Sequence, residues 1–245
     1  MVQEVDFWTR LYAEVRELRD SLPNDVAAKH RGGAILGRPP APGELLVIGL
    51  HPRCEPGERG AELDYGPPSR PSEPNDPSRP PSQRIDRLVA AADLDERATR
   101  AMRDALARAS ESYLWFFGAG GAPEWNSSEF WGQRGETLRS AVEAACLDWH
   151  ERILSVLRPA GLLCVGLAIH GNLAARWGDQ LRERAVIPRP EGDGRLAVEA
   201  DIAIAGQTVP FLATRQSRDD WASAPEERTE LGAALARFSA RAGVR

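Results

Sequence analysis

The segment Glu44-Leu45-Leu46-Val47-Ile48-Gly49-Leu50-His51-Pro52-Arg53 decides the expected fold of this chain. Its apolar run is short and is bounded by turn-forming residues, a pattern typical of a buried β-strand. The run ends in Gly-Leu-His-Pro, so a titratable imidazole follows the expected strand at once. In an open α/β sheet, ligands bind beyond the carboxyl ends of the strands. We therefore expect His51 at a position where chemistry takes place.

The composition is that of an ordinary globular protein. Of 245 residues, 42% are hydrophobic and 27% are charged, which suits a single α/β domain of residues 1–245. No apolar run approaches the roughly 18 residues of a membrane span, and the N-terminus lacks the apolar core of a secretory signal. These features predict a cytoplasmic protein with no membrane partner. No obligate protein partner is evident either.

The spacing of the cysteines and the net charge bear on metal binding and on DNA binding. Cys54, Cys146 and Cys164 are scattered along the chain and lack Cys-x-x-Cys spacing, so we expect no metal site, and we expect no cofactor. The net charge of −5 gives no overall attraction to nucleic acid. A local cationic groove is nevertheless sufficient for DNA binding.

Hydrophobic periodicity predicts strands that alternate with helices. Helices are expected at residues 5–20, 85–94, 99–109, 136–157, 170–177 and 226–242. Strands are expected at 45–50, 112–117 and 161–167, followed by a hairpin of 196–205 and 208–214. Residues 1–43 form a helical N-terminal extension in this interpretation. The alternation predicts a mostly parallel sheet with helices on both faces.

Residues 54–83 are rich in proline and show no hydrophobic period. A segment of this length inside a compact domain is either disordered or a functional loop. It ends in Pro80-Pro81-Ser82, directly before the helix expected at 85–94.

Four motifs, taken in order along the chain, resemble the uracil-DNA glycosylase superfamily. They are Gly49-Leu50-His51-Pro52, Pro80-Pro81-Ser82, Val156-Leu157-Arg158-Pro159 before the strand at 161–167, and Thr214-Arg215-Gln216-Ser217. The resemblance covers residues 44–221. It implies a three-layer α/β/α sandwich around a central, mostly parallel four-stranded sheet, with residues 54–83 as an active-site loop. It also implies a monofunctional, metal-independent DNA glycosylase that acts on a nucleotide flipped out of DNA.

The resemblance implies two catalytic residues. The family uses the loop after its first strand to position or activate water, and a neutral His51 imidazole is suited to this task. Arg215 occupies the place of the family's late histidine, where a cation stabilises negative charge on the departing base. Two other roles remain open: His51 as a loop histidine bonded to the backbone, and Arg215 in a surface ion pair with Asp219 or Asp220.

Other residues are expected to bind the base or the DNA backbone. Aromatic faces stack on a flipped base, and glycine allows a ligand to approach the main chain closely. The residues predicted to bind the base are Leu50, Phe116, Phe117 and Gly118. The residues predicted to contact DNA are Pro80, Pro81, Ser82, Ser217, Arg218 and Trp221. Ordinary turn serines and a packing role for Trp221 are the alternatives, while His30 and His150 are expected to be structural and His170 to support the site.

Departures from the family's usual residues bear on the substrate. His51 stands where Asp or Asn is usual, and residues 113–117 contain no Asn to read a pyrimidine edge. Together with the glycine run from Gly118, this favours an aberrant or modified pyrimidine, such as a bulky substituted cytosine. Such an enzyme would serve in repair or in defence against foreign modified DNA.

Two other functions remain open. The same departures fit a catalytically degenerate module that binds DNA or a base without cleaving it. An α/β hydrolase of nucleoside-like substrates is a third interpretation, although Ser217 lacks the Gly-x-Ser-x-Gly context of an acyl-transfer nucleophile.

Overall fold

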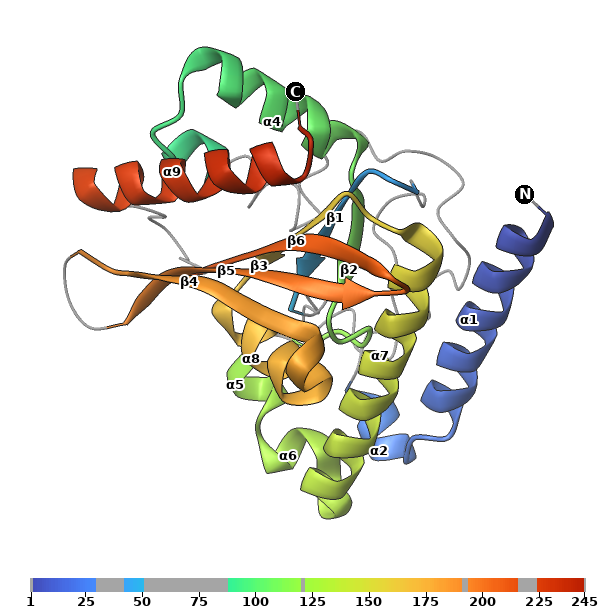
Figure 1. The fold of residues 1–245 in the computed structure, drawn as a ribbon. Helices are drawn as coiled ribbons and strands as arrows, with labels where there is room; N and C mark the ends of the chain where they lie inside the picture. The colour runs from blue at the N-terminus through green and yellow to red at the C-terminus, as the bar shows by residue number, and fades with distance from the viewer. Residues whose placement is uncertain are drawn as a thin grey trace.

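The computed structural model describes residues 2–29, 42–50, 88–119, 122–190, 194–215 and 224–244. At its centre is a six-stranded mixed sheet with the strand order β2-β1-β3-β6-β5-β4 (Figure 1). Helices lie on both faces of this sheet, so the expected α/β class is confirmed.

The sheet has a parallel part and an antiparallel part. The parallel part consists of β2 (Ser110–Tyr113), β1 (Leu45–Gly49), β3 (Gly161–Val165) and β6 (Gln207–Thr214). The antiparallel part adds β5 (Arg195–Ile204) beside β6 and then β4 (Leu181–Pro188). The strands expected at 45–50 and 161–167 and the hairpin of 196–205 and 208–214 are all present. Ala205 and Gly206 close that hairpin with φ of 49° and 78°, the conformation that tight hairpin turns require.

The four-stranded sheet that the resemblance implies is wrong, because the sheet contains six strands, five of which overlap the strands expected from the hydrophobic pattern. The strand without a sequence prediction is β4, which forms the end of the sheet. Its residues from Arg182 to Val186 are all exposed, and only Leu181 and Ile187 are buried. A strand of this kind shows no apolar alternation, which is the signal that identifies half-buried strands.

Alternate residues of β1 point to two separate cores. Leu46 and Ile48 belong to the core on the side of α1 (Val2–Asp20), α7 (Gly135–Leu157) and α8 (Leu167–Trp177). Leu45 and Val47 belong to the core on the side of α4 (Glu96–Arg108) and α9 (Pro225–Arg241). Successive side chains of a strand point to opposite faces of the sheet, so β1 contributes to the core beneath each of the two helical layers.

The helix predictions are confirmed to within a few residues at their ends. Each of α1, α4, α7, α8 and α9 overlaps an expected segment. Of the segment 85–94, residues 88–91 are helical, and 85–87 lie outside the described ranges. The short helices α2 (Asn24–Ala27), α5 (Ala122–Trp125) and α6 (Ser128–Trp131) add buried side chains to the core on the α7 side.

The second strand is shorter than expected. It ends at Tyr113, and Leu114–Phe117 follow it as a bent segment whose side chains are nonetheless buried. An apolar run reports burial but does not distinguish a buried strand from a buried loop, which explains the error in the expected strand 112–117.

A glycine brings α9 close to the segment before α4. A β-carbon on Gly232 would lie 2.4 Å from the main-chain oxygen of Asp93, closer than real β-carbons approach. The Asp93 N–H donates to the Arg228 carbonyl over 3.1 Å and fixes the same contact. The absence of a side chain at residue 232 therefore allows this packing.

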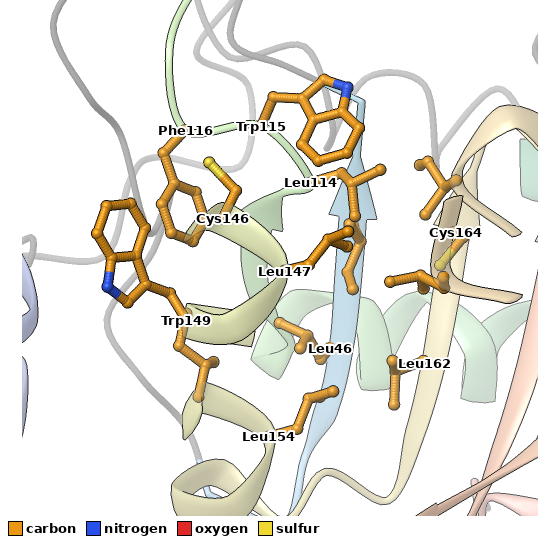
Figure 2. Close-up of a cluster of buried hydrophobic side chains, with 14 of the residues drawn as sticks. Leu46, Leu114, Trp115, Phe116, Cys146, Leu147, Trp149, Leu154, Leu162 and Cys164 are labelled. Atoms are coloured by element: carbon orange, nitrogen blue, oxygen red, sulfur yellow. The ribbon is translucent and has the colours of Figure 1, made fainter. Parts of the chain in front are cut away.

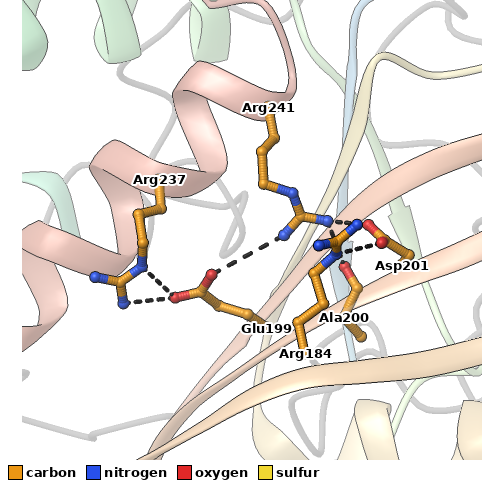
Figure 3. Close-up of polar contacts among 6 residues, drawn as sticks. All are labelled: Arg184, Glu199, Ala200, Asp201, Arg237 and Arg241. Carbon is orange, nitrogen blue, oxygen red and sulfur yellow. Dashed lines mark hydrogen bonds and ion pairs between the residues drawn. The ribbon is translucent and has the colours of Figure 1, made fainter.

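An ionic network joins α9 to β5 (Figure 3). The Arg237 guanidinium donates to Glu199 Oε1 from Nε at 2.8 Å and from Nη2 at 2.6 Å. Arg241 pairs with Asp201, lies 3.9 Å from Glu199 Oε2 and donates to the Ala200 carbonyl. Asp201 also pairs with Arg184 of β4. The Glu199 and Asp201 carboxylates are both buried and have lost contact with water, and their pairing with arginines compensates for that loss.

Candidate active site

The carboxyl ends of β2, β1, β3 and β6 meet at one edge of the sheet because these strands are parallel. Gly49 at the end of β1 is level with Tyr113 at the end of β2. Val165 at the end of β3 is level with Thr214 at the end of β6. We call this side the carboxyl edge. The residues that follow the four ends are Leu50, Leu114, Gly166 and Arg215.

Main-chain hydrogen bonds hold the end of β1 against the segment after β2. The Leu114 N–H donates to the Gly49 carbonyl over 2.7 Å, and the Trp115 N–H donates to the Leu50 carbonyl over 2.9 Å. The Leu50 side chain is half-buried and packs on the core. The main chain is therefore fixed up to the residue that precedes His51, while His51 itself lies outside the described residues.

The three other residues predicted to bind the base lie after β2. Phe116 and Phe117 are fully buried, and Gly118 is buried as well. The Phe116 ring stacks on Trp149 of α7, with centroids 5.8 Å apart and planes inclined by 13° (Figure 2). Trp149 thus occupies one face of Phe116. Base binding by these residues stays a prediction.

Most of the remaining aromatic rings pack against one another. Trp115 is parallel to Trp125 at 6.0 Å between centroids, and Trp125 meets Trp131 edge to face at 4.8 Å. The Trp125 indole N–H donates to Glu143 Oε1 over 2.8 Å, and that of Trp131 donates to the Trp125 carbonyl over 2.6 Å. The three rings belong to the core, and the indole N–H groups of Trp125 and Trp131 are satisfied inside the protein.

Arg215 directly follows β6 and is exposed. Its N–H donates to the Leu196 carbonyl of β5 over 2.8 Å. The preceding Thr214 is fully buried, and its carbonyl accepts from the Gly166 N–H over 2.9 Å. The main chain of Arg215 is therefore held by β5, and the main chain of Thr214 is held by Gly166, the residue that follows β3.

Several predicted site residues lie outside the described ranges. The segment 54–83 is among them, and so are the two possible ion-pair partners of Arg215, Asp219 and Asp220. The predicted DNA contacts outside these ranges are Pro80, Pro81, Ser82, Ser217, Arg218 and Trp221. Their assignments stay predictions.

Two buried histidines flank the parallel strands. His170, one turn into α8, has its Nε2 3.3 Å from Glu183 Oε1 of β4. Burial lowers the pKa of His170, while Glu183 raises it and the Arg195 guanidinium lowers it further. His150 of α7 is fully buried, and its Nε2 donates to the Tyr113 carbonyl over 2.8 Å.

The contact of His150 with the end of β2 was not predicted from the sequence. Burial lowers the pKa of His150 to about 4, against the hydrogen bonding to the backbone of Tyr113 and Leu114. The imidazole is therefore neutral near pH 7. Its partner is a main-chain carbonyl, and because every residue has one, the sequence does not indicate which carbonyl His150 binds. The available signal is the spacing of Cys146 and His150, which places both on one face of α7.

The described part of the chain has an open hollow, and it shows neither a grouping of metal ligands nor a membrane-spanning helix. Within it, no three His, Cys, Asp or Glu side chains are grouped as metal ligands would be. Every helix in the described ranges is too short or too polar to span a lipid bilayer. An open hollow of about 560 Å³ lies beside α7, between Phe7 of α1 and Arg176 in the last turn of α8. Its arginines Arg152 and Arg176 are already paired with carboxylates.

No protein-family model matches this sequence, and no curated protein matches it.

Proposed function

We propose that the protein is a DNA glycosylase of the uracil-DNA glycosylase superfamily, which hydrolyses the N-glycosidic bond of an aberrant or modified pyrimidine in DNA. The observation that supports this proposal best is the arrangement of β1, β3 and β6. Their carboxyl ends share one edge, and β3 separates the other two. Ligands in open α/β sheets bind at such an edge.

The spacing of these strands suits a single nucleoside. Neighbouring strands are about 4.8 Å apart, so β1 and β6 are separated by roughly 10 Å. Leu50 leaves the sheet from β1, and Arg215 leaves it from β6. His51 follows Leu50 directly in the sequence. We assign the two sides of the nucleoside to His51 and Arg215.

The reaction gives each of these residues a task. Water attacks C1′ of the sugar as the bond from C1′ to the base nitrogen breaks. The electron pair of that bond stays with the base, which departs as an anion, and the sugar passes through a state with oxocarbenium character. A neutral His51 imidazole directs the water and accepts its proton, while the Arg215 guanidinium stabilises the anionic base.

A modified pyrimidine is the favoured substrate. Residues 113–117 contain no Asn that could read an unmodified pyrimidine edge, and a glycine run starts at Gly118. Glycine leaves space for a substituent on the base. We therefore expect substituted cytosines to be better substrates than uracil.

The decisive experiment measures abasic sites in DNA duplexes that carry uracil, a thymine mismatch or a 5-substituted cytosine. Cleavage of a substituted cytosine is expected, with losses of about 100-fold or more in His51→Ala and Arg215→Ala. Arg182→Ala is the matched control, because Arg182 is an exposed arginine of β4, which lies at the end of the sheet beyond β5. Circular dichroism confirms that the variants are folded. Full activity in His51→Ala would contradict the assignment.

The same experiment decides the alternative of a binding module. Selective binding of one modified duplex without any abasic product would identify a module that recognises DNA without cleaving it. Strong release of uracil, with no action on substituted cytosines, would instead retain the reaction and refute the proposed substrate.

A further inference from the structure

The segment Tyr113–Phe116 is held from two sides. On one side, the N–H groups of Leu114 and Trp115 donate to the carbonyls of Gly49 and Leu50 at the end of β1. On the other side, α7 contacts the two ends of the segment. His150 Nε2 donates to the Tyr113 carbonyl over 2.8 Å, and the Phe116 ring stacks on Trp149.

His150 and Cys146 are one turn apart on α7 and are both fully buried. This spacing puts them on the same face of the helix, which faces the segment after β2. Figure 2 shows the Cys146 sulfur beside Phe116. Burial raises the pKa of Cys146 to about 12, so its sulfur is a neutral thiol.

His150 gives the Tyr113 carbonyl a hydrogen-bond donor from α7. The Tyr113 carbonyl and the Leu114 N–H belong to the same trans peptide group and therefore point in opposite directions. Because the Leu114 N–H points to β1, the Tyr113 carbonyl points away from it, and among the described strands β2 is the last on that side of the sheet. A buried carbonyl without a donor costs about 1–3 kcal/mol. His150 supplies the donor, and a carbonyl only accepts, so Nε2 carries the proton.

We propose that His150 is a positioning residue for the carboxyl end of β1. By holding the Tyr113 carbonyl, it keeps the Leu114 and Trp115 N–H groups aimed at Gly49 and Leu50, and so it fixes where the chain leaves β1. The catalytic consequence, a correctly placed His51, rests on the proposed function. The positioning itself does not.

This role differs from simple core filling in one respect. A leucine or phenylalanine side chain would fill the space of His150 but would not donate the hydrogen bond that His150 gives the Tyr113 carbonyl. Glutamine is the conservative replacement, because its side-chain amide is also a donor and reaches a similar distance from the main chain. The positioning role therefore predicts rescue by His150→Gln, whereas core filling predicts that leucine is the better substitute.

The test compares His150→Leu, His150→Gln and Ile153→Ala in the full-length chain. Ile153 is fully buried on the same helix, so its variant controls for lost core packing. The readouts are amide hydrogen exchange at Leu114 and Trp115 and the NMR amide resonances of Leu50 and His51. If His150→Leu does not fold, His150→Phe keeps a ring in the same space.

We expect exchange at Leu114 and Trp115 to accelerate at least about tenfold in His150→Leu relative to Ile153→Ala, the effect of losing one hydrogen bond. The resonances of Leu50 and His51 should shift, and His150→Gln should restore both readouts. Unchanged exchange or unchanged resonances in His150→Leu would overturn the proposal.

A cleavage assay on the same variants separates this inference from the proposed function. If the wild type cleaves a modified duplex, its turnover should fall in His150→Leu while KM is retained, and His150→Gln should recover it. If the wild type cleaves none of the duplexes, the proposed function fails, and the exchange and resonance data still decide whether His150 positions the end of β1.

Discussion

Trp149 Nε1 donates a hydrogen bond to Glu14 Oε2 over 2.9 Å and thereby joins α7 to α1, across 135 positions of the sequence. Arg152 contributes a second link, since its Nη2 donates to Glu14 Oε1 over 2.9 Å. The other side of this junction reaches the carboxyl edge, because the Trp149 ring stacks on Phe116. The N-terminal helix therefore supports the segment after β2.

Replacing Glu14 tests this junction. Glu14→Ala leaves the partly buried Trp149 N–H without its acceptor, and we expect the free energy of unfolding to fall by about 1–2 kcal/mol. Glu14→Gln keeps an acceptor oxygen and should lose less. The Arg152 ion pair adds little, because both side chains are more than a third exposed. Urea denaturation followed by tryptophan fluorescence measures the change.

Glu17→Ala, an exposed position on the same helix, is the control. An equal loss in both alanine variants would contradict the junction. The pH dependence gives a second check. The hydrogen bond from Arg152 holds the pKa of Glu14 below its ordinary value of 4.5. Its contribution is present above the unfolded pKa and is lost as the pH falls through the lower folded pKa.

His150 makes the stability of the fold depend on pH. Burial lowers its pKa to about 4 in the folded protein, whereas an unfolded chain titrates near 6.5. Between these values only the unfolded state binds the proton, so stability falls as the pH falls from about 6.5 to about 4. The loss reaches about 3 kcal/mol at 1.36 kcal/mol per pKa unit.

His150→Gln isolates this contribution, because glutamine does not titrate. Urea unfolding of both proteins between about pH 4 and pH 7.5 gives the comparison, in which carboxylates shared by the two proteins cancel. The difference in unfolding free energy should shrink toward low pH as the wild type loses stability. Parallel curves would show that His150 titrates normally in the folded state.

Alanine substitutions at two helical glycines, Gly232 on α9 and Gly171 on α8, should have opposite effects on the free energy of unfolding. Gly232→Ala would force a β-carbon against a main-chain oxygen, which cannot move as a side chain can. We expect a loss of about 1–3 kcal/mol from overpacking, larger than the gain in helix propensity. Gly171→Ala on α8 meets no atom within 4 Å and should stabilise by up to about 1 kcal/mol. Thermal and urea unfolding would reveal the sign of each effect.

The ionic network on β5 should be unequally sensitive to its arginines. Of the three in Figure 3, Arg241 lies near both buried carboxylates and also donates to the Ala200 carbonyl. Arg184 pairs with Asp201 alone and is half exposed. We expect Arg241→Met to cost about 2 kcal/mol and Arg184→Met less than about 1 kcal/mol. The reverse order, measured by urea denaturation, would show that Arg241 is not the centre of the network.

The sequence predicts the parts of the fold that bury regular apolar faces. The helices α1, α4, α7, α8 and α9 and the strands β1, β3, β5 and β6 have the apolar pattern of a half-buried or fully buried element, and each of them overlaps a predicted segment. The bent segment after Tyr113 has the apolar run of a strand because its side chains pack on helices, with Trp115 against Trp125 of α5 and Phe116 against Trp149 of α7. The edge strand β4 was missed because so few of its side chains face the core.

Fewer contacts of the candidate site can be predicted from the sequence. The order of the motifs brings Leu50 and Arg215 to one edge, as the parallel strands require. The role of His150 depends on a main-chain carbonyl, and the role of Trp149 depends on Glu14, which lies 135 positions earlier in the sequence. Such partners are created by folding and have no local sequence signal.

The exposed strand β4 also bears on how copies of this chain meet. A strand at the end of a sheet presents unpaired main-chain groups that can template another strand. Here the charged residues Arg182, Glu183 and Arg184 occupy that strand, its register with β5 shifts at two places, and it ends in Pro188. Charge, irregular register and proline each oppose the addition of a seventh strand, so the same residues that conceal β4 from sequence analysis protect the sheet from growing into aggregates.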